Sequence, residues 1–192
     1  MSIRVAGGYL RGRILKTVPG RVTRPTTGRV REAIFSILQH DIEGTMVLDL
    51  FAGSGALAIE ALSRGAASAI LVEQHPKAVA VIKGNLASCN LKSRLIAADY
   101  RKALAILADE GRRFHLVFAD PPYDFVDSDL IYRQLAEYRL FESGGFLILE
   151  HAGSTSPAGD NIIIRRRFGD SAITIFAYDK KIESDRAVSG DV

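Results

Sequence analysis

The feature that most constrains this chain is residues 46–60, an apolar run that breaks into a glycine turn and then continues with helical spacing. Residues 47–50 are typical of a buried strand, and Gly53 and Gly55 allow the backbone to turn where a side chain would collide with a ligand. The apolar residues between positions 57 and 62 predict a helix packed on a sheet. Such a turn presents N–H groups at a helix N-terminus, which favours an anionic or carboxylate-bearing ligand.

The chain of 192 residues is long enough to bury a full core as one domain with a small appendage. It has neither the roughly 20 consecutive apolar residues of a membrane span nor the apolar segment of a signal peptide, so we expect a cytoplasmic protein. The single cysteine, Cys89, excludes an intrachain disulfide, and the four scattered histidines predict no metal site.

Charge is distributed unevenly along the chain. Residues 1–31 hold eight basic and no acidic side chains, whereas the remainder holds 17 basic and 22 acidic ones. A basic arm on a mildly acidic body indicates phosphate binding, although a solvated surface without a ligand is the alternative.

Hydrophobic periodicity gives the order of the elements. Residues 3–18 alternate apolar and basic side chains around Gly7 and Gly8, which predicts a hairpin. Strands are expected at 69–73, 94–98, 114–119 and 146–150, with helices between them, and a final antiparallel hairpin at 162–168 and 172–178. Together these predict an α/β, Rossmann-like fold with a seven-stranded, mostly parallel sheet and helices on both faces.

The glycine turn alone fits two classes. Residues 53–58 match the relaxed dinucleotide fingerprint and Glu73 lies near the expected ribose-binding position, so a nicotinamide-dependent enzyme is one interpretation. Asp49, inside the first strand, and Asp120-Pro121-Pro122-Tyr123, after a later strand, favour another. Together the two motifs resemble class I S-adenosylmethionine-dependent methyltransferases that act on an exocyclic amino group of a nucleic-acid base.

In an open α/β sheet the ligand lies beyond the carboxyl ends of the strands, so the acids expected there should converge on one crevice. By the resemblance, Glu73 would bind the ribose hydroxyls of S-adenosylmethionine, Asp99 its adenine amino group and Asp49 its ammonium end. The full set of expected cofactor-binding residues is Asp49, Phe51, Ala52, Gly53, Gly55, Glu73, Asp99, Tyr100, Arg24 and Thr26.

The catalytic residues implied by the resemblance are Asp120, Pro121 and Tyr123. An aromatic amine is a poor nucleophile because its lone pair is delocalised into the ring. Two acceptors aimed at its hydrogens, the Asp120 carboxylate and the Pro121 carbonyl, would favour the reactive tetrahedral nitrogen. Tyr123 would stack on the flipped base.

The resemblance extends to the N-terminal segments 4–9, 11–13, 19–20 and 23–35, and so covers residues 3 to about 180. On these segments the chain resembles the bacterial small-subunit ribosomal RNA guanine 2-amino methyltransferase family (RsmD-like). It implies a basic arm over residues 1–22, a methyltransferase domain over 23–182 and a flexible tail over 183–192. Gly28 departs from the acidic residue expected at its position. The expected RNA-binding residues are Arg4, Arg11, Arg13, Lys16 and Arg21.

The predicted function is therefore methyl transfer to the 2-amino group of a guanine in 16S rRNA, by a monomer acting on free rRNA or on the assembled small subunit. Two alternatives remain at this level. A DNA adenine or cytosine amino methyltransferase would share the Asp120 motif, but the chain has no separate target-recognition domain. A non-catalytic RNA-binding protein would not need that motif.

Overall fold

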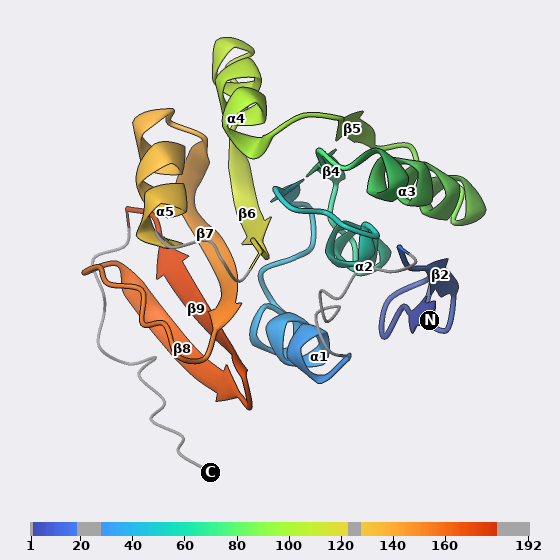
Figure 1. The fold of residues 1–192 in the computed structure, drawn as a ribbon, viewed down its shortest axis with the longest axis horizontal. Coiled ribbons are helices and arrows are strands. Elements are labelled where there is room, and N and C mark those ends of the chain that lie inside the picture. Colours follow the sequence, from blue (N-terminus) through green and yellow to red (C-terminus); the bar gives the residue numbers. More distant parts are fainter. Residues whose placement is uncertain (1, 19–27, 123–127, 180–192) are drawn as a thin grey trace.

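The computed structural model describes residues 2–18, 28–122 and 128–179. Within these ranges the chain forms a two-stranded hairpin followed by alternating helices and strands (Figure 1). The helices are α1 (Gly28–Ile37), α2 (Ala56–Ser63), α3 (Pro76–Ser88), α4 (Tyr100–Asp109) and α5 (Ser128–Glu137). The strands are β1 (Ser2–Arg4), β2 (Ile14–Lys16), β3 (Met46–Asp49), β4 (Ser68–Val72), β5 (Arg94–Ile96), β6 (Phe114–Ala119), β7 (Phe141–Ala152), β8 (Ile162–Phe168) and β9 (Ser171–Ala177).

Seven strands form one sheet in the order β5-β4-β3-β6-β7-β9-β8. The pairs from β5 through β7 are all parallel, and β9 pairs antiparallel with both β7 and β8. The predicted fold class, a mostly parallel sheet with an antiparallel C-terminal hairpin, is confirmed. Among the described residues, no helix has the length and apolar character needed to cross a bilayer.

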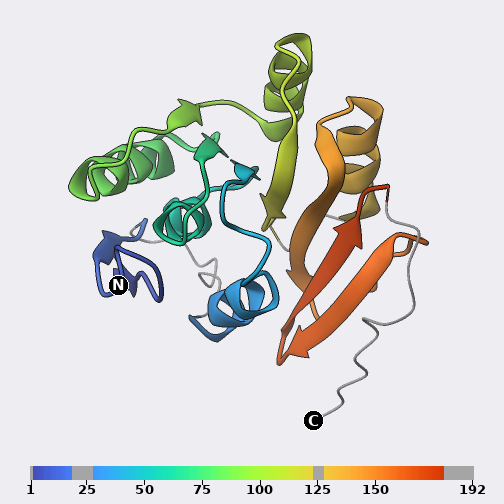
Figure 2. The same cartoon turned by 180° about the vertical axis from the view of Figure 1, so that it is seen from behind.

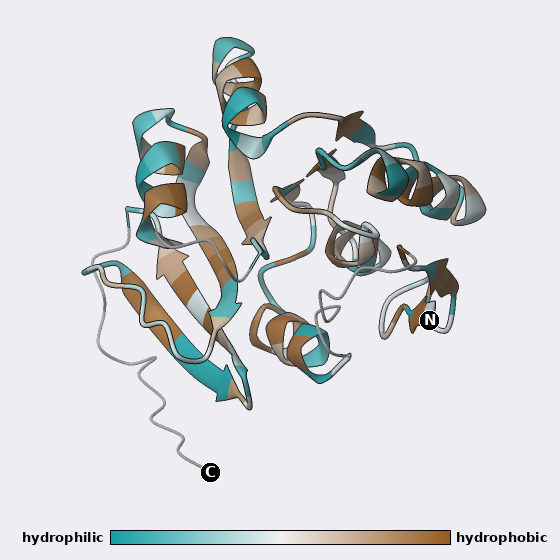
Figure 3. Cartoon of the chain, viewed as in Figure 1, coloured by the Kyte–Doolittle hydropathy of each residue, from teal (hydrophilic) through white to brown (hydrophobic). Residues whose placement is uncertain are grey.

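Both faces of the sheet are buried, and β6 shows why the sequence of its strands is almost continuously apolar. Leu116 and Phe118 point into a core shared with α1, α2 and α3, whereas Val117 and Ala119 point into a second core beneath α4 and α5. Side chains alternate between the faces of a strand, so a strand covered on both sides needs apolar residues at every position. Figure 2 gives the view from behind, and Figure 3 shows the brown, apolar strands at the centre of the molecule.

Local signals set the helix ends. The side chain of Asp99 accepts a hydrogen bond from the Arg101 N–H and caps α4. Pro76 opens α3 at its first turn, where no N–H is required. Gly55 precedes α2 with a φ of 78°, a left-handed conformation that disfavours other residues.

The structure differs from the expected boundaries in several places. Helix α4 begins at Tyr100, directly after Asp99, which caps it. Strand β7 begins at Phe141 instead of Phe146, and Gly144 lies within the shift of register between β6 and β7. The hairpin pairs Ile3 with Leu15, so its loop is much wider than a turn at Gly7 and Gly8.

Candidate functional site

The carboxyl edge of the sheet gathers three acidic side chains from adjacent strands. Asp49 is the last residue of β3, Glu73 directly follows β4, and Asp120 directly follows β6. Since β3 lies between β4 and β6, these acids share one edge, and the charges of Asp120 and Glu73 both act on Asp49. The convergence expected from the sequence is present at these three positions.

Asp49 is a buried acid with unused hydrogen-bonding capacity. Asp49 is only 2% exposed, and its Oδ2 atom has no hydrogen-bond partner among the described residues. Burial raises the pKa of its carboxyl group to about 7, and the nearby Asp120 and Glu73 add to this, whereas backbone hydrogen bonds from Ala58 and Phe51 oppose it. An unpaired carboxylate oxygen in such a place is suited to a cationic group of a ligand.

Glu73 shapes the glycine loop as well as facing the site. Its Oε2 atom accepts the Gly53 N–H at 2.9 Å and its Oε1 atom accepts the His75 N–H at 2.8 Å. These two contacts fix the orientation of the carboxylate beside the glycine loop. The same side chain therefore holds the loop against β4 and presents an acceptor beside it.

The glycine loop turns as predicted, through left-handed conformations at Gly53 (φ 56°) and Gly55 (φ 78°). A Cβ atom on Gly55 would lie 3.1 Å from Leu71 Cδ2, so a side chain there would also meet the core. Ala52 is fixed by its N–H, which donates to the Val72 carbonyl at 3.0 Å. The loop is a rigid cradle at the N-terminus of α2.

Asp99 and Tyr100 lie one strand further out, at the start of α4. Asp99 is exposed, and its Oδ1 atom caps the helix. Tyr100 is buried against Phe51, with ring centroids 5.1 Å apart. The structure thus places Asp99 at the rim of the site, while Tyr100 is mainly a packing residue that supports Phe51.

The candidate catalytic loop, expected from the Asp120 motif, begins at the end of β6. Asp120 is half-buried, Pro121 is buried and Pro122 is exposed. Tyr123 lies outside the described residues, as do Arg21, Arg24, Thr26 and the tail 183–192. The structure therefore brings together the acids and the glycine loop with the first half of the Asp120 motif.

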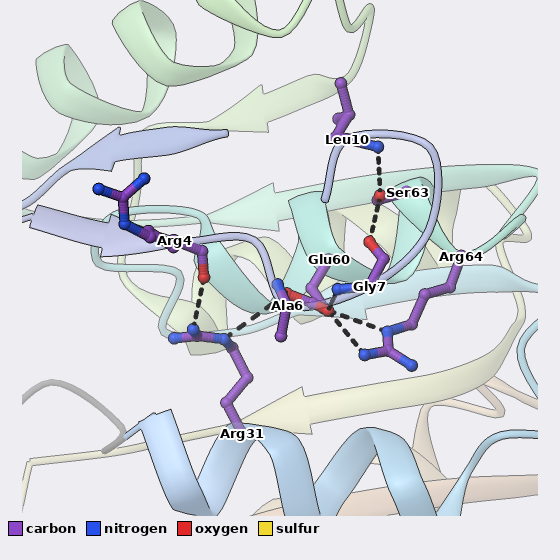
Figure 4. A network of polar contacts seen from close by, with 8 residues as sticks. All are labelled: Arg4, Ala6, Gly7, Leu10, Arg31, Glu60, Ser63 and Arg64. Atoms are coloured by element: carbon purple, nitrogen blue, oxygen red, sulfur yellow. Dashed lines mark hydrogen bonds and ion pairs between the residues drawn. The ribbon is translucent and has the colours of Figure 1, made fainter. Parts of the chain in front are cut away.

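A buried acid in α2 anchors the N-terminal segment, and the sequence reasoning missed it. Glu60 accepts the N–H groups of Ala6 and Gly7 at 2.8 and 2.7 Å, and it contacts Arg64 at 2.9 Å and Arg31 at 3.7 Å (Figure 4). Burial lowers the pKa of the Arg31 guanidinium, and the Glu60 charge opposes that shift. The available signal was one acid in an otherwise apolar stretch of helix.

Close backbone approach completes this anchor. Ser63 accepts the Leu10 N–H and donates to the Gly7 carbonyl (Figure 4). The Ser63 carbonyl also accepts the Tyr9 N–H. A Cβ atom on Gly8, which has a φ of 72°, would lie 1.8 Å from the Ser63 carbonyl oxygen. Gly7 and Gly8 therefore serve the contact with α2 instead of a tight hairpin turn.

The basic side chains of the hairpin face solvent. Arg4, Arg11, Arg13 and Lys16 are all exposed, while Leu15 between them is buried in the core. The loop from Tyr9 to Ile14, together with Ser88 of α3, lines an open groove of about 840 Å³. Buried and exposed side chains alternate along β2, so Leu15 packs the hairpin against the rest of the protein while the basic side chains remain exposed to solvent.

The order of strands, the glycine loop and the acids at the carboxyl edge define the fold and the cofactor edge of a class I methyltransferase. A family model described as "Conserved hypothetical protein 95" matches residues 3–177, and the chain belongs to this family. The match includes the N-terminal hairpin, the glycine loop and the Asp120 motif.

Named relatives agree with this assignment. The chain is 36% identical to the "Putative rRNA methyltransferase YlbH" of Bacillus subtilis (strain 168), over 91% of this chain and 98% of the relative. It is 35% identical to the "Ribosomal RNA small subunit methyltransferase D" of Escherichia coli (strain K12), over 96% and 94%. The solved structure of the "Putative methyltransferase yhhF from Escherichia coli" superposes with a TM-score of 0.80 at 32% identity, covering 92% of this chain and 98% of that one.

Proposed function

We propose that this chain transfers a methyl group from S-adenosylmethionine to the exocyclic 2-amino group of a guanine in small-subunit (16S) ribosomal RNA. The observation that carries the proposal is the unpaired Oδ2 atom of Asp49 at the carboxyl edge, one strand away from Asp120. The family and the names of its rRNA-modifying relatives support the acceptor. We further propose that the enzyme is a cytoplasmic monomer that meets its RNA free or in the small subunit.

The site has the groups that S-adenosylmethionine requires. That cofactor supplies an electrophilic methyl group on a sulfonium and carries an ammonium, a ribose and an adenine. Asp49 is suited to the ammonium because its free oxygen is buried and anionic when ionised. Glu73 would accept the ribose hydroxyls and Asp99 the adenine amino group. The loop of Phe51, Ala52, Gly53 and Gly55 would lie under the methionine part.

Asp120 and Pro121 would activate the amino group. The carboxylate of Asp120 and the carbonyl of Pro121 accept the two N–H hydrogens, which favours the tetrahedral nitrogen with its lone pair free. Asp120 then accepts the proton that the nitrogen releases when it gains the methyl group. The diproline stiffens this loop. Tyr123, outside the described residues, is proposed to stack on the base once it leaves its helix.

The hairpin would hold the RNA. Arg4, Arg11, Arg13 and Lys16 are exposed on a segment without acids, which suits phosphate binding. Arg21, Arg24 and Thr26 lie in the segment between the hairpin and α1. We propose that Arg21 extends the basic surface and that Arg24 and Thr26 border the entrance to the cofactor site.

The test is methyl incorporation from labelled S-adenosylmethionine into three acceptors: free small-subunit rRNA, assembled small subunits that lack the modification, and duplex DNA. We expect label in 2-methylguanosine from a ribosomal acceptor. Asp120→Asn should abolish transfer and keep cofactor affinity within a few-fold, whereas Asp109→Asn, an exposed carboxylate at the far end of α4, should change neither.

Other outcomes would replace the proposal. Methylated adenine or cytosine in DNA would keep the catalytic argument and discard the RNA acceptor. Cofactor binding without label in any acceptor would favour a non-catalytic RNA-binding protein. Binding of NAD in place of S-adenosylmethionine would instead support the alternative that the glycine loop belongs to a nicotinamide-dependent enzyme. Light scattering on the purified protein tests the monomer.

A further inference from the structure

Strand β8 carries three consecutive arginines that the proposed site does not use. Arg165, Arg166 and Arg167 are all exposed, whereas Ile162, Ile163 and Ile164 before them are partly buried. We call these three residues the β8 arginine row. Figure 3 shows the change along the strand, from brown in its first half to teal toward its arrowhead. Among the strands that the structure describes, β8 lies at an edge of the sheet and pairs with β9 alone.

Topology places this row on the same edge of the sheet as the candidate active site. Strand β9 is antiparallel to both β7 and β8, so β8 runs in the direction of β7 and β6, as their arrowheads in Figure 1 show. The arginines occupy the second half of β8 and therefore lie toward the carboxyl edge, where Asp120 follows β6. Three strand spacings separate β8 from β6, which is about 15 Å across the sheet.

Two guanidinium groups of the row are held in place by neutral acceptors, which leave their charge unpaired. Arg165 Nη2 donates to the Pro157 carbonyl at 2.5 Å, and Arg167 Nε donates to the Gly169 carbonyl at 3.1 Å. A neutral carbonyl fixes the direction of a guanidinium and leaves its charge in place. Within the described residues, none of the three arginines forms an ion pair with a carboxylate.

From the N-terminal hairpin across the sheet to β8, the charge changes from positive to negative and back to positive. The basic hairpin lies beside α2 and α3, the acids Asp49, Glu73 and Asp120 lie at the centre of the sheet, and the β8 arginine row lies at the far edge. Figures 1 and 2 both show the hairpin and β8 at opposite ends of the molecule. An RNA whose target base reaches the acids at the centre of the carboxyl edge would present phosphates on both sides of them.

We propose that the β8 arginine row is a second phosphate-binding surface for the acceptor RNA, so that the RNA spans the candidate active site between this row and the N-terminal hairpin. The inference rests on the proposed function for the identity of the nucleic acid. Arginine suits the role because its planar, permanently charged guanidinium matches phosphate oxygens in a bidentate way. Protection of an exposed sheet edge by charge is the competing role for such a row.

Arg166 is the residue to change, because it lies on the opposite face of the strand from Arg165 and Arg167 and its side chain makes none of their carbonyl contacts. Arg166→Glu keeps a charge on the edge and repels phosphate, and Arg166→Gln only removes the attraction. The matched control is Arg113→Glu, an exposed arginine directly before β6 at the opposite end of the sheet.

The readouts are fluorescence anisotropy with labelled small-subunit rRNA at several salt concentrations, light scattering, and methyl transfer by each variant. For Arg166→Gln we expect a several-fold loss of RNA affinity and a salt slope smaller by about one. For Arg166→Glu we expect a larger loss of RNA affinity, on the order of tenfold. Arg113→Glu should bind the RNA with the affinity of the unaltered protein. Methyl transfer at low RNA concentration should fall in the same order.

Equal losses for Arg166→Glu and Arg113→Glu would overturn the inference, since they would report net charge alone. Unchanged RNA binding of Arg166→Gln would also overturn the inference, whether or not light scattering shows that this variant self-associates. If Arg166→Glu does not fold, the comparison rests on Arg166→Gln and its salt slope. Failure of the proposed function is distinct, because the unaltered protein would then methylate no ribosomal acceptor.

Discussion

The side chain of Asn85 holds the backbone of Lys16 from both sides. Asn85 Oδ1 accepts the Lys16 N–H at 2.9 Å, and Asn85 Nδ2 donates to the Lys16 carbonyl at 2.9 Å and to the Ser54 carbonyl at 2.8 Å. Asn85 is buried in α3, Lys16 belongs to β2 of the basic hairpin, and Ser54 lies in the glycine loop. One amide therefore joins the proposed RNA-binding element to the proposed cofactor loop.

Asn85→Ala should weaken both the stability of the fold and the binding of the cofactor. It removes three hydrogen bonds from a buried site, so we expect the free energy of unfolding to fall by about 2–4 kcal/mol. Cofactor affinity should also fall, because the Ser54 carbonyl loses its restraint. Urea denaturation and calorimetric titration with S-adenosylmethionine measure the two effects. Lys83→Ala, an exposed position on the same helix, is the control, and normal cofactor affinity in a folded Asn85→Ala variant would contradict the link.

Gly8→Ala should be far more damaging than Gly12→Ala. Both glycines have left-handed backbones, with φ values of 72° and 86°, so alanine costs about 1 kcal/mol or more at either position through backbone strain. Only at Gly8 would the new Cβ atom collide with a backbone carbonyl, that of Ser63, whereas the space around Gly12 is open. Thermal denaturation of the two variants compares them directly. Equal decreases in melting temperature for the two variants would contradict this prediction, because the backbone near Ser63 would then move to accommodate the new Cβ atom.

Glu60→Gln should release the N-terminal segment from α2. The variant leaves Arg31 and Arg64 without their common carboxylate and weakens the acceptor for Ala6 and Gly7, which for a buried pair costs about 3–5 kcal/mol. Hydrogen exchange at residues 6–10 should accelerate more than exchange in β6. Glu110→Gln, which loses an exposed pair with Arg94, should cause a much smaller change in stability. If hydrogen exchange at residues 6–10 is unchanged in Glu60→Gln, Glu60 does not anchor the N-terminal segment.

Asp49 makes a pH dependence testable. Its pKa is raised by burial to about 7 in the folded chain, above its value when unfolded. The folded state therefore binds the extra proton, and the stability from this group is complete below about pH 4 and is lost as pH rises toward 7 and above. Urea denaturation between pH 5 and 8 should show that slope, and Asp49→Asn should remove it.

The same carboxyl group should couple cofactor binding to proton release. A cationic ammonium beside Asp49 favours its ionised form, so the affinity for S-adenosylmethionine should increase from pH 6 to pH 8. Calorimetry in buffers with different ionisation enthalpies counts the protons released. Asp109→Asn should retain the dependence and Asp49→Asn should lose it. The idea fails if Asp49→Asn titrates like the unaltered protein.

Most of the architecture could be predicted from the sequence. The apolar runs of β3, β4 and β6 required a sheet buried on both faces, and the glycines between β3 and α2 required a tight turn. Acids directly after successive strands then had to meet at one edge, as Asp49, Glu73 and Asp120 do. These predictions succeed because strand alternation, backbone conformation and the parallel order of strands are properties of short segments of the chain.

Long-range partners could not be predicted in this way. Nothing local to Glu60 indicates that it accepts N–H groups from residues more than 50 positions earlier, and nothing local to Asn85 points to Lys16 and Ser54. The hairpin itself was predicted correctly, but its sequence did not indicate that Gly7 and Gly8 contact Arg64 and Ser63 at the end of α2.

The sequence by itself determined the strand–turn–helix unit, the fold class and the acids of the carboxyl edge, because each follows from periodicity and from residues a few positions apart. Only the tertiary structure decided that the basic hairpin is anchored to the glycine loop through buried side chains and that the β8 arginines lie on the edge that holds Asp120. Burial of a charge or an amide requires a partner, and which partner is near depends on how distant segments pack.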